Sequence, residues 1–148
     1  MAARRRADAV WNGDLPSGKG RVSASTSGAF KDLAVSWATR SEQPSNGQTS
    51  PEELVAAAHA SCFAMALSAG LGRAGHPPEQ LDVSATVTFD RVGDGFKVTS
   101  SELEVRGRVP GLDAAGFQKA AQDAKDGCPI SQALKGNVEL SVNASLAS

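Results

Sequence analysis

Short stretches of alternating apolar and polar positions dominate the first forty residues. Residues 7–11 and 21–25 show this alternation, and a segment rich in glycine, proline and serine joins them. A period of two is typical of a half-buried β-strand, and the joining residues favour a turn. The pattern therefore predicts a first hairpin, and a further alternating stretch predicts a third strand from Leu33 to Arg40.

The second half of the chain alternates over longer distances. Residues 83–89 and 96–109 are strand-like and are separated by a Gly-Asp-Gly segment, which predicts a second hairpin. Residues 138–142 have the same period and predict a last strand.

An alanine-rich segment between the hairpins has the residues that start a helix. Ser50 is placed at the N-cap, Pro51 at the first helical position and Glu53 at the third, which together form a capping box. We expect a helix from Pro51 to about Arg73, where a cluster of glycines and two prolines ends it.

Two further helices are expected after the second hairpin. Asp113 is a suitable N-cap for a helix to about Asp126, and the Cys128-Pro129 pair opens a short third helix. The order βββ-α-ββ-αα-β predicts an α+β fold with mainly antiparallel pairing. With 148 residues, 41% of them hydrophobic, the chain is expected to be a single domain, 1–148.

Charge and composition limit the classes of partner and cofactor that the chain is expected to bind. A formal net charge of −1 gives no reason to expect nucleic acid as a partner. The chain contains no uninterrupted run of about eighteen apolar residues, so the sequence does not predict a membrane span. Three arginines at positions 4–6 lack the apolar stretch of a secretion signal, so a cytoplasmic protein is expected. The two cysteines and two histidines lack metal-ligand spacing, and no phosphate-binding glycine loop is present, so no cofactor is expected.

The two cysteines are the candidate chemical groups. Cys62 lies in the middle of the long helix, where an inert core thiol would be ordinary, whereas Cys128 lies at a helix N-terminus, where peptide N–H groups favour a thiolate. Local physics therefore favours Cys128 as the more acidic thiol. In a reducing compartment such cysteines are more often catalytic or redox-active than structural. They can form a redox pair if the fold joins them.

A charged pair is the second candidate feature. A thiol has a pKa near 8.5, so a reactive cysteine needs a cation nearby, and Arg40 at a strand end is the best-placed one. Glu52, in the first turn of the long helix, would ordinarily be an exposed residue that interacts with the helix dipole. It precedes Cys62 by ten residues, about 15 Å of helical rise, so a shared site requires Glu52 from a second subunit.

His59 raises a different possibility, because it precedes Cys62 by three residues. This spacing permits a cysteine nucleophile with a histidine base, as in a cysteine hydrolase. The sequence marks neither an orienting residue nor an oxyanion hole, so a packing role for His59 is favoured.

Two sequence strings resemble the cysteine helices of the OsmC/Ohr family of thiol peroxidases, and of the OsmC branch in particular. They are Thr49-Ser-Pro-Glu-Glu-Leu-Val-Ala-Ala-Ala-His-Ala-Ser-Cys62 and Gly127-Cys-Pro-Ile-Ser. The resemblance extends over nearly the whole chain, through Trp11-Asn-Gly-Asp, the Thr39-Arg40 step and Val109-Pro-Gly-Leu-Asp.

The resemblance implies a function and a site. Cys62 would be the peroxidatic thiolate, Cys128 its resolving partner, and Arg40 with Glu52 the activating pair, which reverses the local ranking of the thiols. It also implies an intertwined homodimer whose sheets wrap around central helices. The substrates would be organic hydroperoxides and, secondarily, hydrogen peroxide, and an external dithiol, such as a lipoylated protein, would reduce the disulfide. A non-catalytic module that binds a hydrophobic ligand in the dimer groove is the alternative.

Overall fold

The computed structural model describes residues 1–42 and 45–147. The chain forms two compact units, Met1–Leu54 and Val55–Ser148, which are described separately below. The elements are α+β, as the sequence predicts, and the expectation that 1–148 acts as a single domain stays a prediction.

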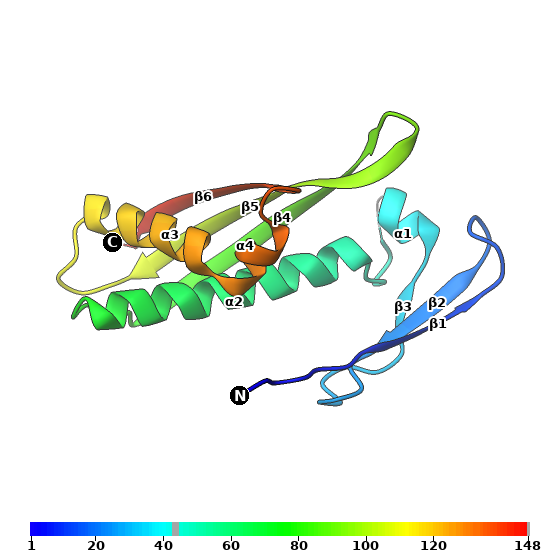
Figure 1. Ribbon diagram of the computed structural model, residues 1–148, viewed down its shortest axis with the longest axis horizontal. Helices are drawn as coiled ribbons and strands as arrows, with labels where there is room; N and C mark the ends of the chain where they lie inside the picture. Colours follow the sequence, from blue (N-terminus) through cyan, green and yellow to red (C-terminus); the bar gives the residue numbers. More distant parts are fainter. Residues whose placement is uncertain (43–44, 148) are drawn as a thin grey trace. The chain divides into compact units, whose positions relative to one another are not determined.

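The first unit contains a three-stranded antiparallel sheet in the order β1-β2-β3. The strands are β1 (Asp8–Asn12), β2 (Lys19–Ser23) and β3 (Leu33–Val35), shown in blue to cyan in Figure 1. Gly20 pairs with Trp11 on one side and Val35 on the other. A Cβ at Gly20 would lie 2.7 Å from the Trp11 ring, so the indole can cover the strand only because this residue is glycine. The first predicted hairpin is confirmed.

The prediction that the third strand continues to Arg40 is wrong. β3 ends at Val35, and a short helix, α1 (Trp37–Ser41), follows. The Ser36 hydroxyl accepts a hydrogen bond from the Thr39 N–H, and the Thr39 hydroxyl accepts one from the Ser36 N–H. This reciprocal cap offsets the strand-like alternation, because it satisfies two backbone donors locally. Arg40 therefore lies in the last turn of a helix.

The long helix α2 (Pro51–Arg73) has the predicted bounds. The Ser50 hydroxyl accepts a hydrogen bond from the Glu53 N–H at 3.1 Å, which is one half of the predicted capping box. The Glu53 carboxylate instead accepts from the Thr49 hydroxyl at 2.7 Å. Pro51 still satisfies the first helical position, where no N–H is required.

The second unit contains a sheet in the order β4-β5-β6, covered by helices. Its elements are β4 (Gln80–Val92), β5 (Gly95–Arg108), α3 (Ala114–Gly127), α4 (Pro129–Leu134) and β6 (Glu139–Leu146). The second hairpin, the Asp113 N-cap and the helix that follows Cys128 are confirmed. β6 runs parallel to β5, because the connection through α3 and α4 is long enough to return the chain to the end of the sheet from which β5 starts (Figure 1).

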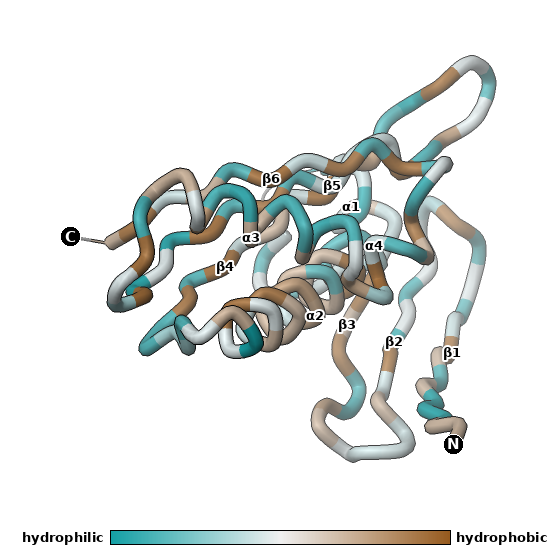
Figure 2. Tube along the Cα trace, turned by 60° about the vertical axis from the view of Figure 1, so that its left-hand side comes forward, coloured by the Kyte–Doolittle hydropathy of each residue, from teal (hydrophilic) through white to brown (hydrophobic). Residues whose placement is uncertain are grey.

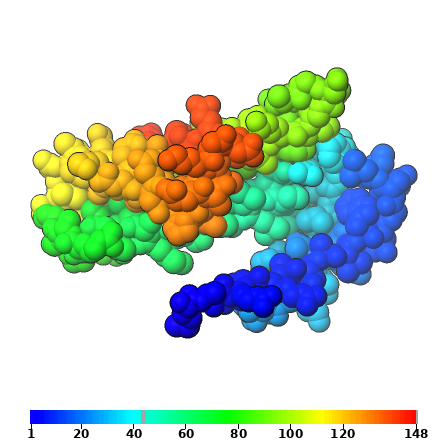
Figure 3. Space-filling view, viewed as in Figure 1, coloured from blue at the N-terminus to red at the C-terminus, as the bar shows by residue number. Residues whose placement is uncertain are grey.

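One face of this sheet carries the core. Alternate residues of β5, including Ser101, Leu103 and Val105, are buried beneath α2 and α3, while their neighbours are exposed. The buried side chains of α2 repeat at helical spacing, and those of α3 pack in the same cluster. The largest of them are Phe63, Leu67 and Leu71 of α2, and Phe117 of α3. Figure 3 shows α2 in green beside α3 in yellow and orange. Burial of each such side chain stabilises the unit by about 1.5–3 kcal/mol.

The apolar character of α2 exceeds what the sequence analysis allowed. By length and composition alone this helix could cross a membrane, with a mean hydropathy of 1.7 over its most apolar window. Figure 2 shows apolar residues along much of its length. A mostly buried core helix of a soluble protein meets the same two criteria, but only 22% of this window is buried in the structure. The buried part includes Phe63 and Leu67, which belong to the core cluster.

Candidate active site

The fold brings the two cysteines together within the second unit. Cys62 lies in the middle of α2, and Cys128 is both the last cap of α3 and the N-cap of α4. Both are reduced thiols, and the Cys128 side chain is hydrogen-bonded to the Cys62 thiol. Cys128 is buried and Cys62 is half-buried. Two neighbouring thiols, one of them partly accessible, are candidates for a redox pair.

The surroundings of Cys62 within this unit keep its thiol protonated. Burial is the largest effect and raises the pKa of Cys62, and the hydrogen bond with Cys128 raises it further. The backbone N–H of Ile130, in the first turn of α4, opposes both by donating to the sulfur. A thiol whose pKa is raised is a weak nucleophile at neutral pH, so Cys62 chemistry requires an additional positive charge.

The start of α4 acts differently from the sequence prediction. The sequence places Cys128 where helix N–H groups would stabilise its own thiolate. In the structure Cys128 makes no side-chain capping hydrogen bond to α4, and the Ile130 N–H donates to Cys62. The peptide groups at this helix start therefore assist the cysteine on the other helix.

Arg40 and Glu52 form an ion pair within the first unit. Arg40 Nε donates to Glu52 Oε1 at 2.8 Å, and the side chains are 37% and 8% exposed, respectively. Glu52 is therefore buried, unlike the exposed helix-dipole residue that its position in the sequence suggests. Its second oxygen, Oε2, is buried without a hydrogen-bond partner among the described residues. A buried carboxylate keeps a nearby guanidinium in place.

His59 is fully buried at the centre of a hydrogen-bonded bridge. Its Nδ1 lies 2.6 Å from the Ser101 hydroxyl of β5, and its Nε2 lies 2.8 Å from the Ser131 hydroxyl of α4. Burial lowers the pKa of His59, so the ring is neutral near pH 7. Because each ring nitrogen has a serine partner, the imidazole is not positioned as a base for Cys62, and the hydrolase hypothesis loses its support.

The two serines were missed from the sequence, although both carry a detectable signal. Ser101 occupies the inward phase of β5, in line with Leu103 and Val105, so it is a polar residue at an apolar position. Ser131 lies in the first turn of α4, three residues after the N-cap Cys128. A buried hydroxyl requires a hydrogen-bond partner, and His59 is the side chain that provides one for both serines.

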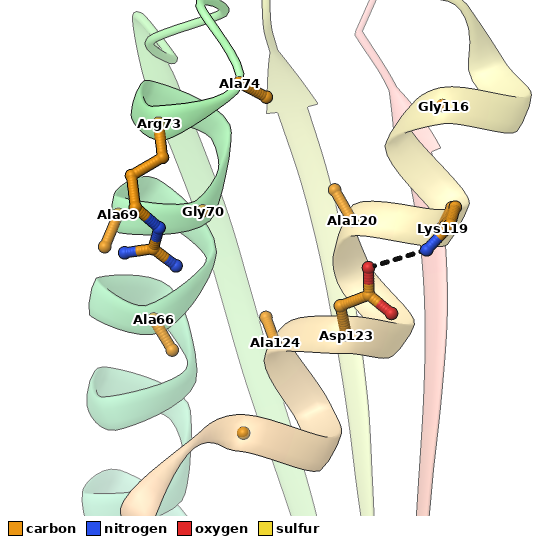
Figure 4. Close-up of a pocket in the computed structure, with 11 residues that line it drawn as sticks. Ala66, Ala69, Gly70, Arg73, Ala74, Gly116, Lys119, Ala120, Asp123 and Ala124 are labelled. Carbon is orange, nitrogen blue, oxygen red and sulfur yellow. Dashed lines mark hydrogen bonds and ion pairs between the residues drawn. The ribbon is translucent and has the colours of Figure 1, made fainter.

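A groove lies between α2 and α3. Figure 4 shows its small lining residues, among them Ala66, Gly70 and Ala120, and the Lys119–Asp123 ion pair on α3, whose Nζ and Oδ2 are 2.9 Å apart. Its volume is about 620 Å³, and its lining includes neither cysteine. Among the described residues, no group of three or more histidine, cysteine or acidic side chains is placed to hold a metal ion.

Comparison with known proteins places this arrangement in a family. The model of the OsmC-like protein family matches residues 44–143. The chain belongs to the OsmC family. It is 44% identical to the peroxiredoxin OsmC of Escherichia coli over 140 residues, which cover 95% of this chain and 96% of that protein. It is 32% identical to an organic hydroperoxide resistance protein of Xanthomonas axonopodis pv. citri over 95 residues, 64% of this chain and 65% of that protein.

Solved structures of the family share the fold. The organic hydroperoxide resistance protein OhrB of Bacillus subtilis matches with a TM-score of 0.71 and 24% identity, over 94% of this chain and 97% of that one. The OsmC-like protein of Mycoplasma pneumoniae matches with a TM-score of 0.75 and 14% identity, over the full length of both chains. The predicted OsmC-like fold is therefore confirmed at the level of one chain.

Proposed function

We propose that this OsmC-family protein is a thiol peroxidase that reduces organic hydroperoxides, and secondarily hydrogen peroxide, in defence against oxidative or osmotic stress. The observation that carries the proposal is the contact between the Cys62 and Cys128 thiols. The names of its relatives, peroxiredoxin and organic hydroperoxide resistance protein, support the same activity. A non-catalytic ligand-binding role is not favoured.

The reaction has two steps in which Cys62 is the peroxidatic residue. Its thiolate attacks the distal peroxide oxygen, the O–O bond breaks, and the alkoxide takes up a proton to leave as the alcohol. Cys62 is then a sulfenic acid. The Cys128 sulfur attacks the Cys62 sulfur, the S–O bond breaks, and the hydroxide leaves as water after protonation. Two thiols and one hydroperoxide give one disulfide, one alcohol and one water.

Arg40 and Glu52 are proposed to supply the positive charge that Cys62 requires. Glu52 precedes Cys62 by ten residues on α2, about 15 Å of rise, so one helix does not bring them into contact. We therefore assign the ion pair to the Cys62 of a second subunit in a homodimer. The guanidinium would stabilise the thiolate and the developing alkoxide, and Glu52 would hold its orientation.

The disulfide must be reduced for another turnover. An external dithiol can attack it by exchange, and a lipoylated protein is the proposed reductant. The proposed location is the cytoplasm, because a reducing compartment would keep both thiols ready.

Two cysteine variants test the reaction. Cys62→Ser should abolish hydroperoxide consumption, because no nucleophile remains. Cys128→Ser should release one alcohol per chain and then stop, with the sulfenic acid trapped by dimedone and detected by mass spectrometry. Full turnover by Cys62→Ser would refute the mechanism.

Mixed dimers test the assignment of Arg40 to the partner subunit. Cys62→Ser chains, which have no nucleophile, and Arg40→Met chains, which are slowed at least about tenfold, are unfolded together and refolded. If sites form across subunits, half of the dimers are mixed and each has one intact site, so about a quarter of the wild-type activity should return. If Arg40 served the cysteine of its own chain, mixing would restore nothing.

A further inference from the structure

We propose that His59 is a positioning residue for the disulfide-forming step. It holds α4 against α2, through Ser131, so that the Cys128 sulfur stays in contact with the Cys62 sulfur. This inference rests on the proposed two-cysteine reaction and assigns to that reaction a group whose two ring nitrogens are both bonded to serines.

The bridge joins the same two helices as the thiols do. His59 precedes Cys62 by three residues on α2, and Ser131 of α4 lies three residues after Cys128, the N-cap of α4. Residues three apart lie on the same side of a helix, one turn from each other. The His59–Ser131 bond of 2.8 Å therefore ties α2 to α4 about one turn away from the sulfur contact.

The short helix needs such a tie. α4 has only six residues, Pro129–Leu134, too few to be stable as an isolated helix. Ser131 is 1% exposed and His59 is fully buried, so water cannot replace either partner without opening the unit. Loss of a hydrogen bond in such a place leaves a buried polar group unpaired, whereas loss at the surface would not.

The other end of the bridge provides the contrast. Ser101, also fully buried, lies 2.6 Å from His59 Nδ1 but belongs to the central strand β5. β5 is held by β4 on one side and β6 on the other, over most of its length. Loss of the Ser101 bond should therefore leave α4 in place, whereas loss of the Ser131 bond should release it.

Release of α4 has a measurable consequence for the disulfide. In the oxidised chain the Cys62–Cys128 bond itself holds α4. In the reduced chain only non-covalent contacts hold it, so removal of the bridge lets the thiols separate. The equilibrium constant for disulfide formation then falls in proportion to the population in which the thiols still meet.

The test is a matched pair of substitutions, Ser131→Ala and Ser101→Ala. Each removes one of the two serine hydroxyls that are hydrogen-bonded to the His59 imidazole. Full-length proteins are equilibrated with reduced and oxidised dithiothreitol, the thiols are alkylated, and mass spectrometry gives the dithiol-to-disulfide ratio. Exchange removes two electrons and two protons from the cysteines and transfers them to the oxidised reagent. Ser131→Ala should lower the equilibrium constant about tenfold, which corresponds to about 30 mV. Ser101→Ala should stay within about threefold of wild type.

Two further variants keep the proposal testable if a serine variant does not fold. The amide nitrogen of Gln can replace His Nε2, and that of Asn can replace His Nδ1. His59→Gln should therefore retain the bond to Ser131 and the wild-type constant. His59→Asn should lose that bond and show a fall of about tenfold, like Ser131→Ala.

Equal constants for the two serine variants, or for His59→Gln and His59→Asn, would overturn the positioning role. The assay uses no peroxide, so it separates this proposal from the proposed function. If hydroperoxide did not oxidise the wild-type thiols but Ser131→Ala still lowered the constant, the peroxidase would be refuted and the bridge supported. If hydroperoxide closed the disulfide and the serine variants were equal, only the bridge would be refuted.

Discussion

Replacement of His59 by leucine should cost more stability than its size suggests, because it leaves two buried hydroxyls without a partner. Ser101 is 0% exposed and Ser131 is 1% exposed, and each has the imidazole as its side-chain partner. An unpaired buried hydroxyl costs about 1–3 kcal/mol. The sum for His59→Leu is therefore about 2–6 kcal/mol, a large part of the roughly 5–15 kcal/mol that stabilises a typical domain.

Removal of the orphaned hydroxyls should reverse most of this loss. The triple variant His59→Leu, Ser101→Ala, Ser131→Ala replaces all three polar groups by apolar ones, a change that can be nearly neutral. Urea unfolding followed by circular dichroism, in reducing buffer at one fixed protein concentration, gives the free energy of unfolding for each variant. We expect the triple variant to be more stable than His59→Leu by about 1–4 kcal/mol.

Additive losses would refute this reasoning. If the two serine substitutions destabilised the His59→Leu background as much as they destabilise the wild type, the hydroxyls would not depend on the imidazole. The two hydrogen bonds of His59 would then contribute nothing measurable to the free energy of unfolding.

Three other predictions follow from single contacts. Arg40→Met should slow oxidation of Cys62 by a hydroperoxide at pH 7 at least about tenfold and move the pH–rate profile to higher pH, because burial and the hydrogen bond with Cys128 both raise the thiol pKa. An unchanged stopped-flow profile would show that Arg40 does not belong to the site. Gly107→Ala should cost about 1–3 kcal/mol in urea unfolding, since its Cβ would lie 2.5 Å from the buried Phe117 ring, and adding Phe117→Leu should recover part of the loss; equal stability of Gly107→Ala and wild type would contradict the packing. Burial holds the pKa of His59 below 6.5, so the unfolded chain binds a proton before the folded chain does as the pH falls, and the free energy of unfolding should drop by up to about 1.4 kcal/mol per pH unit below pH 6.5. His59→Gln should remove this slope when unfolding is measured between pH 7.5 and 5.5, and an identical slope in the variant would disprove the burial effect.

Local chemistry predicted the helices better than it predicted the end of the third strand. Ser50 and Pro51 specify the start of α2, and Asp113 specifies the start of α3, because caps act over three or four residues. The stretch from Leu33 to Arg40 also alternates, but the Ser36–Thr39 cap decides its second half. Alternation alone could not reveal that a reciprocal hydrogen bond would stop the strand at Val35.

The sequence pointed to candidate residues but not to their contacts. Resemblance named Cys62, Cys128, Arg40 and Glu52, and the structure joins the thiols to each other and the charges to each other. The sequence could not show that the Ile130 N–H would be directed at Cys62, because that direction depends on how α4 packs against α2. The His59 bridge escaped for the same reason, since its partners come from a strand and a helix that are distant in sequence.

The most direct test of the central claim is a count of thiols before and after one equivalent of an organic hydroperoxide is added to the reduced protein. Mass spectrometry of the alkylated, digested chain locates any new bond, and chromatography measures the alcohol. The account predicts that both thiols disappear into a Cys62–Cys128 disulfide within one chain, with one alcohol formed per disulfide. Two thiols that remain, with the hydroperoxide unconsumed, would contradict it.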